Sequence, residues 1–312
     1  MPALIRALRV ATAALSAVNR LLGAPASRTS SPDPRINALL EAAGQARKAC
    51  RAAEAATILR QVLERDRHQV GALRGLRELA VEGGRWADAV EPQTRLVAVV
   101  PATDRPREAE WLAVIHYELG RTEMAAGAPR RAIPHFRDAV RTDRRFVPAT
   151  IALGDAYEAA GDQRESVRVW ERGAEVTPLL PILSRLEKAY RQEGRPSRMI
   201  ALYRAALDRA PDDLALGVAL GRVYFELEML DEAADQLEKI EVRAPDLPAV
   251  HAFLGAIFER RGQVREAFEE YRRAVQLALR FGPPHRCAAC GLGWPAWQDR
   301  CPGCGRWNTL RS

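Results

Sequence analysis

The sequence predicts an all-α protein: a solenoid of stacked two-helix repeats followed by a small module that binds a metal through four cysteines. Three observations carry this prediction. The composition favours helices, a residue pattern recurs about every 34 positions, and two Cys-x-x-Cys pairs lie near the C-terminus. Ala, Leu and Arg dominate, and such residues lose little side-chain freedom in a helix. Val and Ile occur nowhere in the alternating runs that indicate a strand.

Composition and charge narrow the class of protein. With 47% hydrophobic and 28% charged residues, the chain is suited to burying a core and is not of the disordered type. The formal net charge of +7 lies at the two ends, since residues 1–35 carry +4, residues 281–312 carry +3, and residues 36–280 are neutral. A nucleic-acid binder carries a basic face on its main body. We therefore expect no nucleic-acid partner.

The first 22 residues form a predicted amphipathic helix. One arc of roughly 140° collects its polar side chains, which are Arg6, Arg9, Thr12, Ser16, Asn19 and Arg20. Its longest charge-free stretch, residues 10–19, is far shorter than the roughly 20 apolar residues that cross a bilayer. Three interpretations stay open: a peripheral membrane anchor, a helix that caps the first repeat, and a secretory signal that ends near Ala24. A linker rich in Pro and Ser follows at residues 23–35.

The repeats occupy residues 36–280, in about seven units. A residue that is small in every unit except the fifth marks the same position at successive intervals of 34, 43, 34, 33, 34 and 34 residues: Ala55, Ala89, Ala132, Ser166, Met199, Ala233 and Ala267. A period of 34 is that of the tetratricopeptide repeat, a helix–turn–helix unit. The long interval contains about nine extra residues near 104–112. Because one unit cannot bury its apolar face alone, the stack shares a continuous core.

Three further positions keep register with the marker. Five residues before it stand Gly127, Gly161, Gly194 and Gly262, where the turn between the paired helices needs a residue without a Cβ. Four residues after it stand Leu59, Phe136, Trp170, Tyr203, Leu237 and Tyr271, and twelve after it Pro101, Pro178, Pro211 and Pro245. We assign the large apolar residues to the core and the prolines to helix ends. The first two units depart from the pattern: Cys50 replaces the turn glycine, and Gln93 replaces the large apolar residue.

The C-terminal module, residues 281–312, contains the predicted metal ligands. Cys287 and Cys290 form one pair and Cys301 and Cys304 a second, each followed by a glycine. Two residues between thiolates let both sulfurs reach one ion, and four thiolates suit tetrahedral zinc or iron. A redox dithiol would need a βαβ context, which the sequence lacks. We predict one zinc or iron ion bound by the four cysteines.

The predicted site is structural, since four protein ligands leave no position for water or substrate. An electron-transfer role for bound iron is an alternative. Trp294, Trp297 and Trp307 are expected to pack around the two cysteine pairs and supply the core of so small a module. We interpret His285 as a surface residue rather than a fifth ligand.

The sequence contains no motif of a known catalytic site, and we expect no enzyme. A phosphate-binding loop, a nucleophile elbow, a zinc-protease motif and a kinase signature are all missing from the sequence. The five histidines are scattered, and acidic pairs such as Asp212 and Asp213 fall at helix starts, where acidic residues are ordinary.

Function is expected instead in the concave groove that the first helix of each unit lines. Counting back eleven and eight positions from each marker gives the predicted groove pairs Arg121 and Met124, Asp155 and Glu158, Lys188 and Arg191, and Arg222 and Phe225. Three of these pairs offer cations, two of them beside an apolar side chain, which suits an acidic peptide or helix. A solvated, charged scaffold face is the competing interpretation.

The layout resembles the lipopolysaccharide assembly protein B family of Gram-negative bacteria. The specific part of the resemblance is the stretch CPGCGRWNT, from Cys301 to Thr309, which matches the pattern CPxCxxWxT. The resemblance implies that Cys287, Cys290, Cys301 and Cys304 hold the metal of a rubredoxin-like unit, which packs on the repeats and clamps their geometry. It further implies a cytoplasmic adaptor at the inner membrane. Such an adaptor governs proteolysis of the lipid A pathway deacetylase by a membrane-bound AAA+ protease.

One departure from that family concerns the N-terminus. The family carries a transmembrane helix, whereas this chain has an amphipathic segment that contains Arg6 and Arg9. A general protein–protein interaction scaffold with a structural metal site and an unrelated client is therefore the alternative function.

Overall fold

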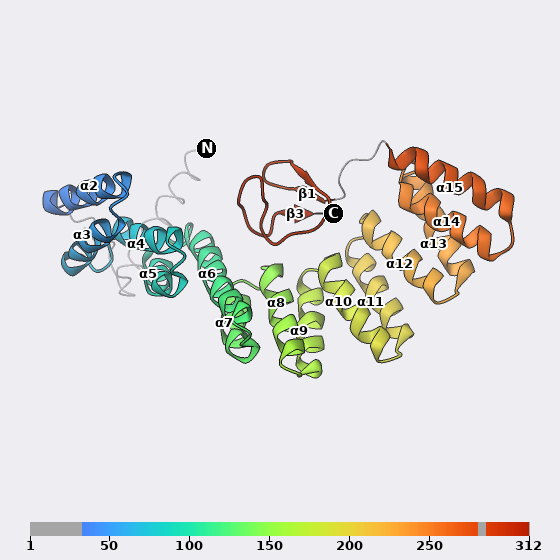
Figure 1. Ribbon diagram of the computed structural model, residues 1–312, viewed down its shortest axis with the longest axis horizontal. Coiled ribbons are helices and arrows are strands. Elements are labelled where there is room, and N and C mark those ends of the chain that lie inside the picture. The colour runs from blue at the N-terminus through green and yellow to red at the C-terminus, as the bar shows by residue number, and fades with distance from the viewer. Residues whose placement is uncertain (1–32, 280–284, 312) are drawn as a thin grey trace, which may run out of the picture. The chain divides into compact units, whose positions relative to one another are not determined.

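The computed structural model describes residues 33–279 and 285–311, which form helices throughout except for a small C-terminal sheet (Figure 1). The predicted fold class, an all-α tetratricopeptide solenoid with a small C-terminal module, is confirmed. The first seven described helices are α2 (Pro34–Lys48), α3 (Ala52–Arg65), α4 (Val70–Glu82), α5 (Trp86–Val99), α6 (Arg105–Ala125), α7 (Pro129–Thr142) and α8 (Val147–Ala159). The remaining helices are α9 (Gln163–Val176), α10 (Leu180–Gln192), α11 (Pro196–Arg209), α12 (Leu214–Glu226), α13 (Leu230–Arg243), α14 (Pro248–Arg260) and α15 (Val264–Ala278).

The chain divides into two compact units between Leu79 and Ala80. In the first, α3 presents an amphipathic face whose buried side chains include Leu59 and Val62. In the second, α5 to α15 pack each against the next in sequence, and strands follow after α15. The predicted amphipathic helix of residues 1–22 and nearly all of the linker lie outside the described residues. Among the helices that are described, none is long and apolar enough to cross a membrane.

The helix boundaries follow from the turn residues of the repeat. Gly127, Gly161, Gly194 and Gly262 all have φ between 66° and 85°, in the left-handed region that a glycine adopts without strain. Two residues with side chains occupy the same register, Cys50 with φ 59° and Glu228 with φ 57°. The predicted substitution of the turn glycine by Cys50 is thus confirmed. Helices α5, α9, α11 and α13 each end two residues before one of the four predicted prolines.

In four of the units the large residue of the second helix packs against a glycine on the first helix, as the third and fourth units illustrate. Phe136 and Trp170 are 1% and 2% exposed. Added Cβ atoms at Gly120 and Gly154 would lie 2.4 Å from the Phe136 ring and 2.0 Å from the indole of Trp170. The glycines therefore make room for the rings, because real Cβ atoms do not approach other heavy atoms so closely.

In the fifth unit, polar groups replace the contact between a glycine and a large apolar side chain. Its first helix, α10, has Glu187 where the neighbouring units have this glycine, and its large residue is Tyr203. The Tyr203 hydroxyl donates to Glu187 Oε2 at 2.7 Å, and Arg222 from α12 donates to both oxygens of the same carboxylate at 3.0 and 2.6 Å. Burial alone would raise the pKa of Glu187, but the hydrogen bonds from Arg222 and Tyr203 lower it below its usual range.

The nine extra residues of the third unit lengthen its first helix. Helix α6 has 21 residues, whereas α8, α10, α12 and α14 have 13 each. The insertion is therefore a helical extension and not a loop. It begins at Arg105 and carries Arg107, Glu110 and Trp111.

The C-terminal module is built on a three-stranded antiparallel sheet. Its strands are β1 (His285–Cys287), β2 (Gly293–Trp294) and β3 (Leu310–Arg311), in the order β2-β1-β3. His285 pairs with Trp294 and Cys287 with Leu310. The sheet thereby holds the first cysteine of the first pair beside the chain that follows the second pair.

Candidate metal centre and predicted groove

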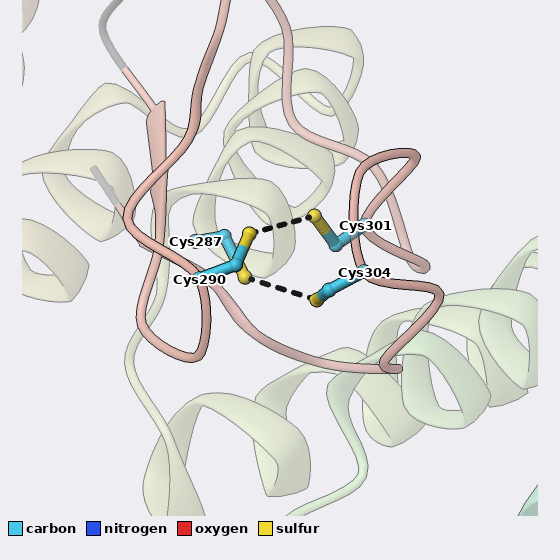
Figure 2. A group of neighbouring side chains, drawn as sticks. All are labelled: Cys287, Cys290, Cys301 and Cys304. Atoms are coloured by element: carbon cyan, nitrogen blue, oxygen red, sulfur yellow. Dashed lines mark hydrogen bonds between the residues drawn. The ribbon is translucent and has the colours of Figure 1, made fainter.

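The four cysteines converge from two facing loops (Figure 2). Cys287 and Cys290 lie on the turn that leaves β1, where the Gly291 amide donates to the Cys287 carbonyl at 2.8 Å. Cys301 and Cys304 lie on an equivalent turn, where the Gly305 amide donates to the Cys301 carbonyl at the same distance. Gly291 and Gly305 have φ of 75° and 70°, so each turn needs its glycine.

The spacing of the sulfurs fits a tetrahedral ion. The four sulfur atoms lie within 4.8 Å of one another, with 3.7 Å between Cys287 and Cys304 and 3.8 Å between Cys290 and Cys301. A zinc–sulfur bond of about 2.3 Å gives a tetrahedron whose edge is about 3.8 Å. The cluster is thus compatible with one ion held by four thiolates. His285, the residue weighed as a fifth ligand, is not among these ligand atoms.

The pKa values of the cysteine thiols in the cluster are shifted in different directions. A hydrogen bond with Thr309 Oγ1, at 3.2 Å from the sulfur, is the main reason that the pKa of Cys287 falls to about 6. A hydrogen bond from the Cys304 amide is the main cause that lowers the pKa of Cys301. The Leu292 amide also lowers the pKa of Cys290, but desolvation and the three neighbouring thiols outweigh it and raise that pKa to about 12. Four adjacent thiolates thus need a cation to balance their charge.

Two of the three tryptophans complete the module's core as predicted. Trp294 and Trp297 pack against buried Cys287, Cys301 and Leu310. Trp297 also packs against the core of the later repeats. Trp307 differs from the prediction, since it lies against the repeats, with its ring 5.5 Å from that of Tyr117 on α6 and nearly perpendicular to it.

The module is held against the array by polar contacts that the sequence analysis did not identify. The Tyr117 hydroxyl donates to Asp299 Oδ2 at 2.6 Å, and the Asn308 side-chain amide donates to the Arg145 carbonyl at 3.1 Å. Burial, followed by the hydrogen bond to Asp299, raises the pKa of Tyr117 far above its usual value, so the phenol stays a donor. The contact between module and repeats that the family resemblance implies is therefore present.

Of the predicted groove residues, Arg121 on α6 contacts the C-terminal module, whereas Phe225 on α12 contacts the later repeats. Arg121 lies 3.3 Å from Glu118 and 3.7 Å from Asp299, so this groove position faces the C-terminal module. Met124 packs against the core of the third and fourth units. Phe225 packs against the core of the later repeats, and Arg260 lies over its ring at 5.3 Å.

The charges of the groove form pairs between successive units instead of a strip of free cations. Asp155 and Glu158 on α8 pair with Arg185 at 2.7 Å and Lys188 at 3.2 Å on α10. Farther along, Arg191 pairs with Glu187 and Glu226, and Arg222 pairs with the same two carboxylates. The expected cationic character is thus neutralised. The pairs bind the first helix of one unit to that of the next.

A second group of possible ligands lies at the last two units, and the sequence analysis passed over it. Buried His251 places Nε2 2.6 Å from the Pro245 carbonyl and Nδ1 2.7 Å from Glu270 Oε2. Glu241 lies 3.8 Å from Nδ1 but also pairs with Arg273 at 3.2 Å. The Nδ1 to Glu270 distance is that of a hydrogen bond, which is shorter than the spacing of two ligands on one ion. We interpret this group as a hydrogen bond between a buried histidine and a partly exposed carboxylate.

Comparison with known proteins agrees with the fold. A family model described as "Tetratricopeptide repeat" matches residues 190–257. Lipopolysaccharide assembly protein B of Escherichia coli strain K12 is 22% identical over 263 residues, which cover 80% of this chain, and the protein of strain O157:H7 matches equally. The match spans 64% of the relatives' own length. Superkiller protein 3 of Schizosaccharomyces pombe is 27% identical over 192 residues, covering 57% of this chain and 13% of that protein.

Several solved structures are similar over about half of the chain. MamA from Desulfovibrio magneticus RS-1 has a TM-score of 0.40 at 18% identity, and covers 54% of this chain and 96% of its own. YrrB, described as a tetratricopeptide protein with an unusual peptide-binding site, has a TM-score of 0.38 at 16% identity, with 53% and 86% covered. The chain thus has a tetratricopeptide-repeat fold, and its sequence is similar to that of lipopolysaccharide assembly protein B.

Proposed function

We propose that this protein is a non-catalytic adaptor that binds a client protein on its repeats. The observation that carries the proposal is the seating of the four-cysteine module on α6 through Tyr117, Asp299 and Trp307. A module attached in this way stiffens the third unit and leaves the array to present side chains to a partner. Tetratricopeptide stacks bind peptides and helices on surfaces of this kind.

The finer proposal follows the similarity to lipopolysaccharide assembly protein B. The client is a deacetylase of the lipid A pathway, and the adaptor couples it to a membrane-bound AAA+ protease. The similarity over 80% of this chain supports this assignment. We place the client on the predicted groove, at Arg121, Met124, Lys188, Arg191, Arg222 and Phe225. There the client meets paired charges, so it must exchange ion pairs as it binds.

We further propose that the cysteine cluster holds one zinc or iron ion in a structural role. Cys287, Cys290, Cys301 and Cys304 would supply four thiolates, and the ion would supply the cross-link that joins the two turns. Residues 1–22 would bring the adaptor to the cytoplasmic surface of the inner membrane as a peripheral anchor. Deleting them should move the protein from the membrane fraction to the soluble fraction.

The experiment that tests the function is deletion of the gene, followed by measurement of the deacetylase half-life. We expect a longer half-life, a higher deacetylase level and more lipid A. An unchanged half-life would remove this function. Cross-linking and mass spectrometry on the tagged full chain would then identify the client of a general scaffold. Elemental analysis that finds only zinc, together with no reducible absorbance, would eliminate electron transfer by iron.

A further inference from the structure

The helical extension of α6 lines one side of a cleft that is separate from the predicted groove residues. The cleft has a volume of about 1000 Å³. Its first wall is the N-terminal half of α6, with Arg107, Glu110 and Trp111 in the extension and Val114 just after it. Its second wall is the turn between α7 and α8 with the start of α8, which supplies Asp143, Arg145, Phe146 and Val147. The C-terminal module closes the third side with residues 305–309 and Arg311, and Thr177 also lines the cleft. A first helix of ordinary length would lack Arg107, Glu110 and Trp111.

The cleft brings together several cations that have no acidic partner among the described residues. Four arginines line it, against Glu110 and Asp143. Within residues 33–279 and 285–311, the guanidinium groups of Arg107, Arg145 and Arg306 form no ion pair and no hydrogen bond. By contrast, the predicted groove cations Arg191 and Arg222 each bind two carboxylates. Free guanidinium groups are the stronger attraction for an anion, because binding breaks no existing pair.

The cleft also offers apolar surface beside the arginines. Trp111 and Trp307 are half-buried, and Phe146 forms part of the buried core below them. The Asp143 carboxylate accepts a hydrogen bond from the backbone amide of Arg145, in the same turn, at 2.8 Å. Aromatic faces flanked by arginines are the composition of binding hot spots. A ligand for such a cleft combines carboxylates with at least one apolar side chain.

We propose that this cleft binds an acidic peptide segment of a partner protein, with an aromatic or aliphatic side chain seated between Trp111 and Trp307. The inference deepens the proposed adaptor function and rests on it. Its volume is at the upper end for small-molecule pockets, which favours an extended peptide over a single small anion. Carboxylates of the peptide pair with Arg107, Arg145 and Arg306.

The test begins with a library of displayed random dodecapeptides, selected on the immobilised metal-loaded full chain. We expect enriched peptides that are rich in Asp and Glu around one large apolar residue. An enriched peptide is then labelled with fluorescein, and its affinity for the full chain is measured by fluorescence anisotropy. Arg145→Glu and Arg306→Glu should each weaken binding by on the order of tenfold or more, because each removes one charge-assisted contact and adds a repulsion.

Matched controls are available beside the cleft. Arg144 and Arg105 are exposed neighbours that do not line it, so Arg144→Glu and Arg105→Glu should change the affinity by less than about twofold. Each variant is checked for metal content and helicity, since residue 306 follows the cysteine pair closely. The proposal is overturned if no acidic peptides are enriched. It is equally overturned if the charge reversals in the cleft weaken binding no more than the controls do.

The outcomes also separate this inference from the proposed function. If the gene deletion lengthens the deacetylase half-life but Arg145→Glu and Arg306→Glu restore it fully and bind enriched peptides normally, the adaptor function stands and the cleft proposal fails. If acidic peptides bind in the cleft while the half-life is unaffected by deletion, the cleft stands and the deacetylase is not its client.

Discussion

The hydrogen bond between Tyr117 and Asp299 offers a direct measure of how firmly the metal module is attached. Tyr117→Phe removes only the hydroxyl, and the ring keeps its contacts with Phe136, Phe146 and Trp307. Hydrogen bonds to charged groups contribute about 1.5–3 kcal/mol. Because the Asp299 side chain is 29% exposed and also meets a neighbouring arginine, we expect the lower end, about 1.5 kcal/mol.

The assay is urea unfolding of the cobalt-substituted full chain, followed by two signals. Far-UV circular dichroism reports the helices, and cobalt–thiolate absorption reports the module. The matched control is Tyr271→Phe, because the Tyr271 hydroxyl donates to Glu259 at 2.7 Å on an exposed surface, where such a bond contributes less. We expect the free energy of unfolding to fall by about 1.5 kcal/mol for Tyr117→Phe and by less than about 0.5 kcal/mol for the control.

A double-mutant cycle decides whether the loss belongs to this bond. In an Asp299→Asn background, the cost of Tyr117→Phe should shrink, since the charged acceptor has already been removed. Equal costs for the Tyr117 and Tyr271 variants, or a Tyr117 cost that Asp299→Asn leaves unchanged, would refute the idea that this hydrogen bond fastens the module.

Three further predictions concern the metal, a buried carboxylate and a glycine. Cys304→Ser should lower bound metal from about one ion per chain to near zero by elemental analysis, because one of four thiolates is lost; full retention would contradict the site. Glu187→Gln should cost about 1–3 kcal/mol at neutral pH in urea unfolding. Because folding lowers the pKa of Glu187, its contribution is present above about pH 4.3 and is lost as the pH falls through the folded value; a cost independent of pH would contradict this. Gly154→Ala should destabilise by about 2 kcal/mol or more in thermal unfolding, since the new Cβ meets buried Trp170. The matched change Gly44→Ala, in helix α2 with nothing within 4 Å, should stabilise by about 0.5–1 kcal/mol; equal effects of the two would contradict the packing argument.

Local patterns in the sequence were sufficient to predict the repeat architecture and the clustering of the four cysteines. The turn glycines, the prolines beyond four of the second helices and the large apolar residue of the second helix all act within one unit. Their spacing therefore repeats with the period of the chain. The four cysteines are similarly local, because two residues between sulfurs satisfy one ion in either turn. A departure from the repeat pattern could also be predicted, since Cys50 occupies the position of the turn glycines and adopts their left-handed conformation.

Relations between units depended on the tertiary structure. No periodicity predicts that Asp299 meets a tyrosine 182 positions earlier, or that Trp307 leaves the module's core to lie on α6. The groove cations could be counted from the marker positions. Their pairing with carboxylates of the next unit, such as that of Arg222 with Glu187, depends on how two helices are stacked.

The sequence alone therefore predicted the two-helix repeat, the prolines that follow four of its second helices and which thiols can share an ion, because these properties are set by neighbours along the chain. The tertiary structure decided what the inserted residues do, which cations are already neutralised and which remain free around the cleft at Arg145. Those properties depend on the distance between groups from different units. That distance is set by the packing of many side chains at once.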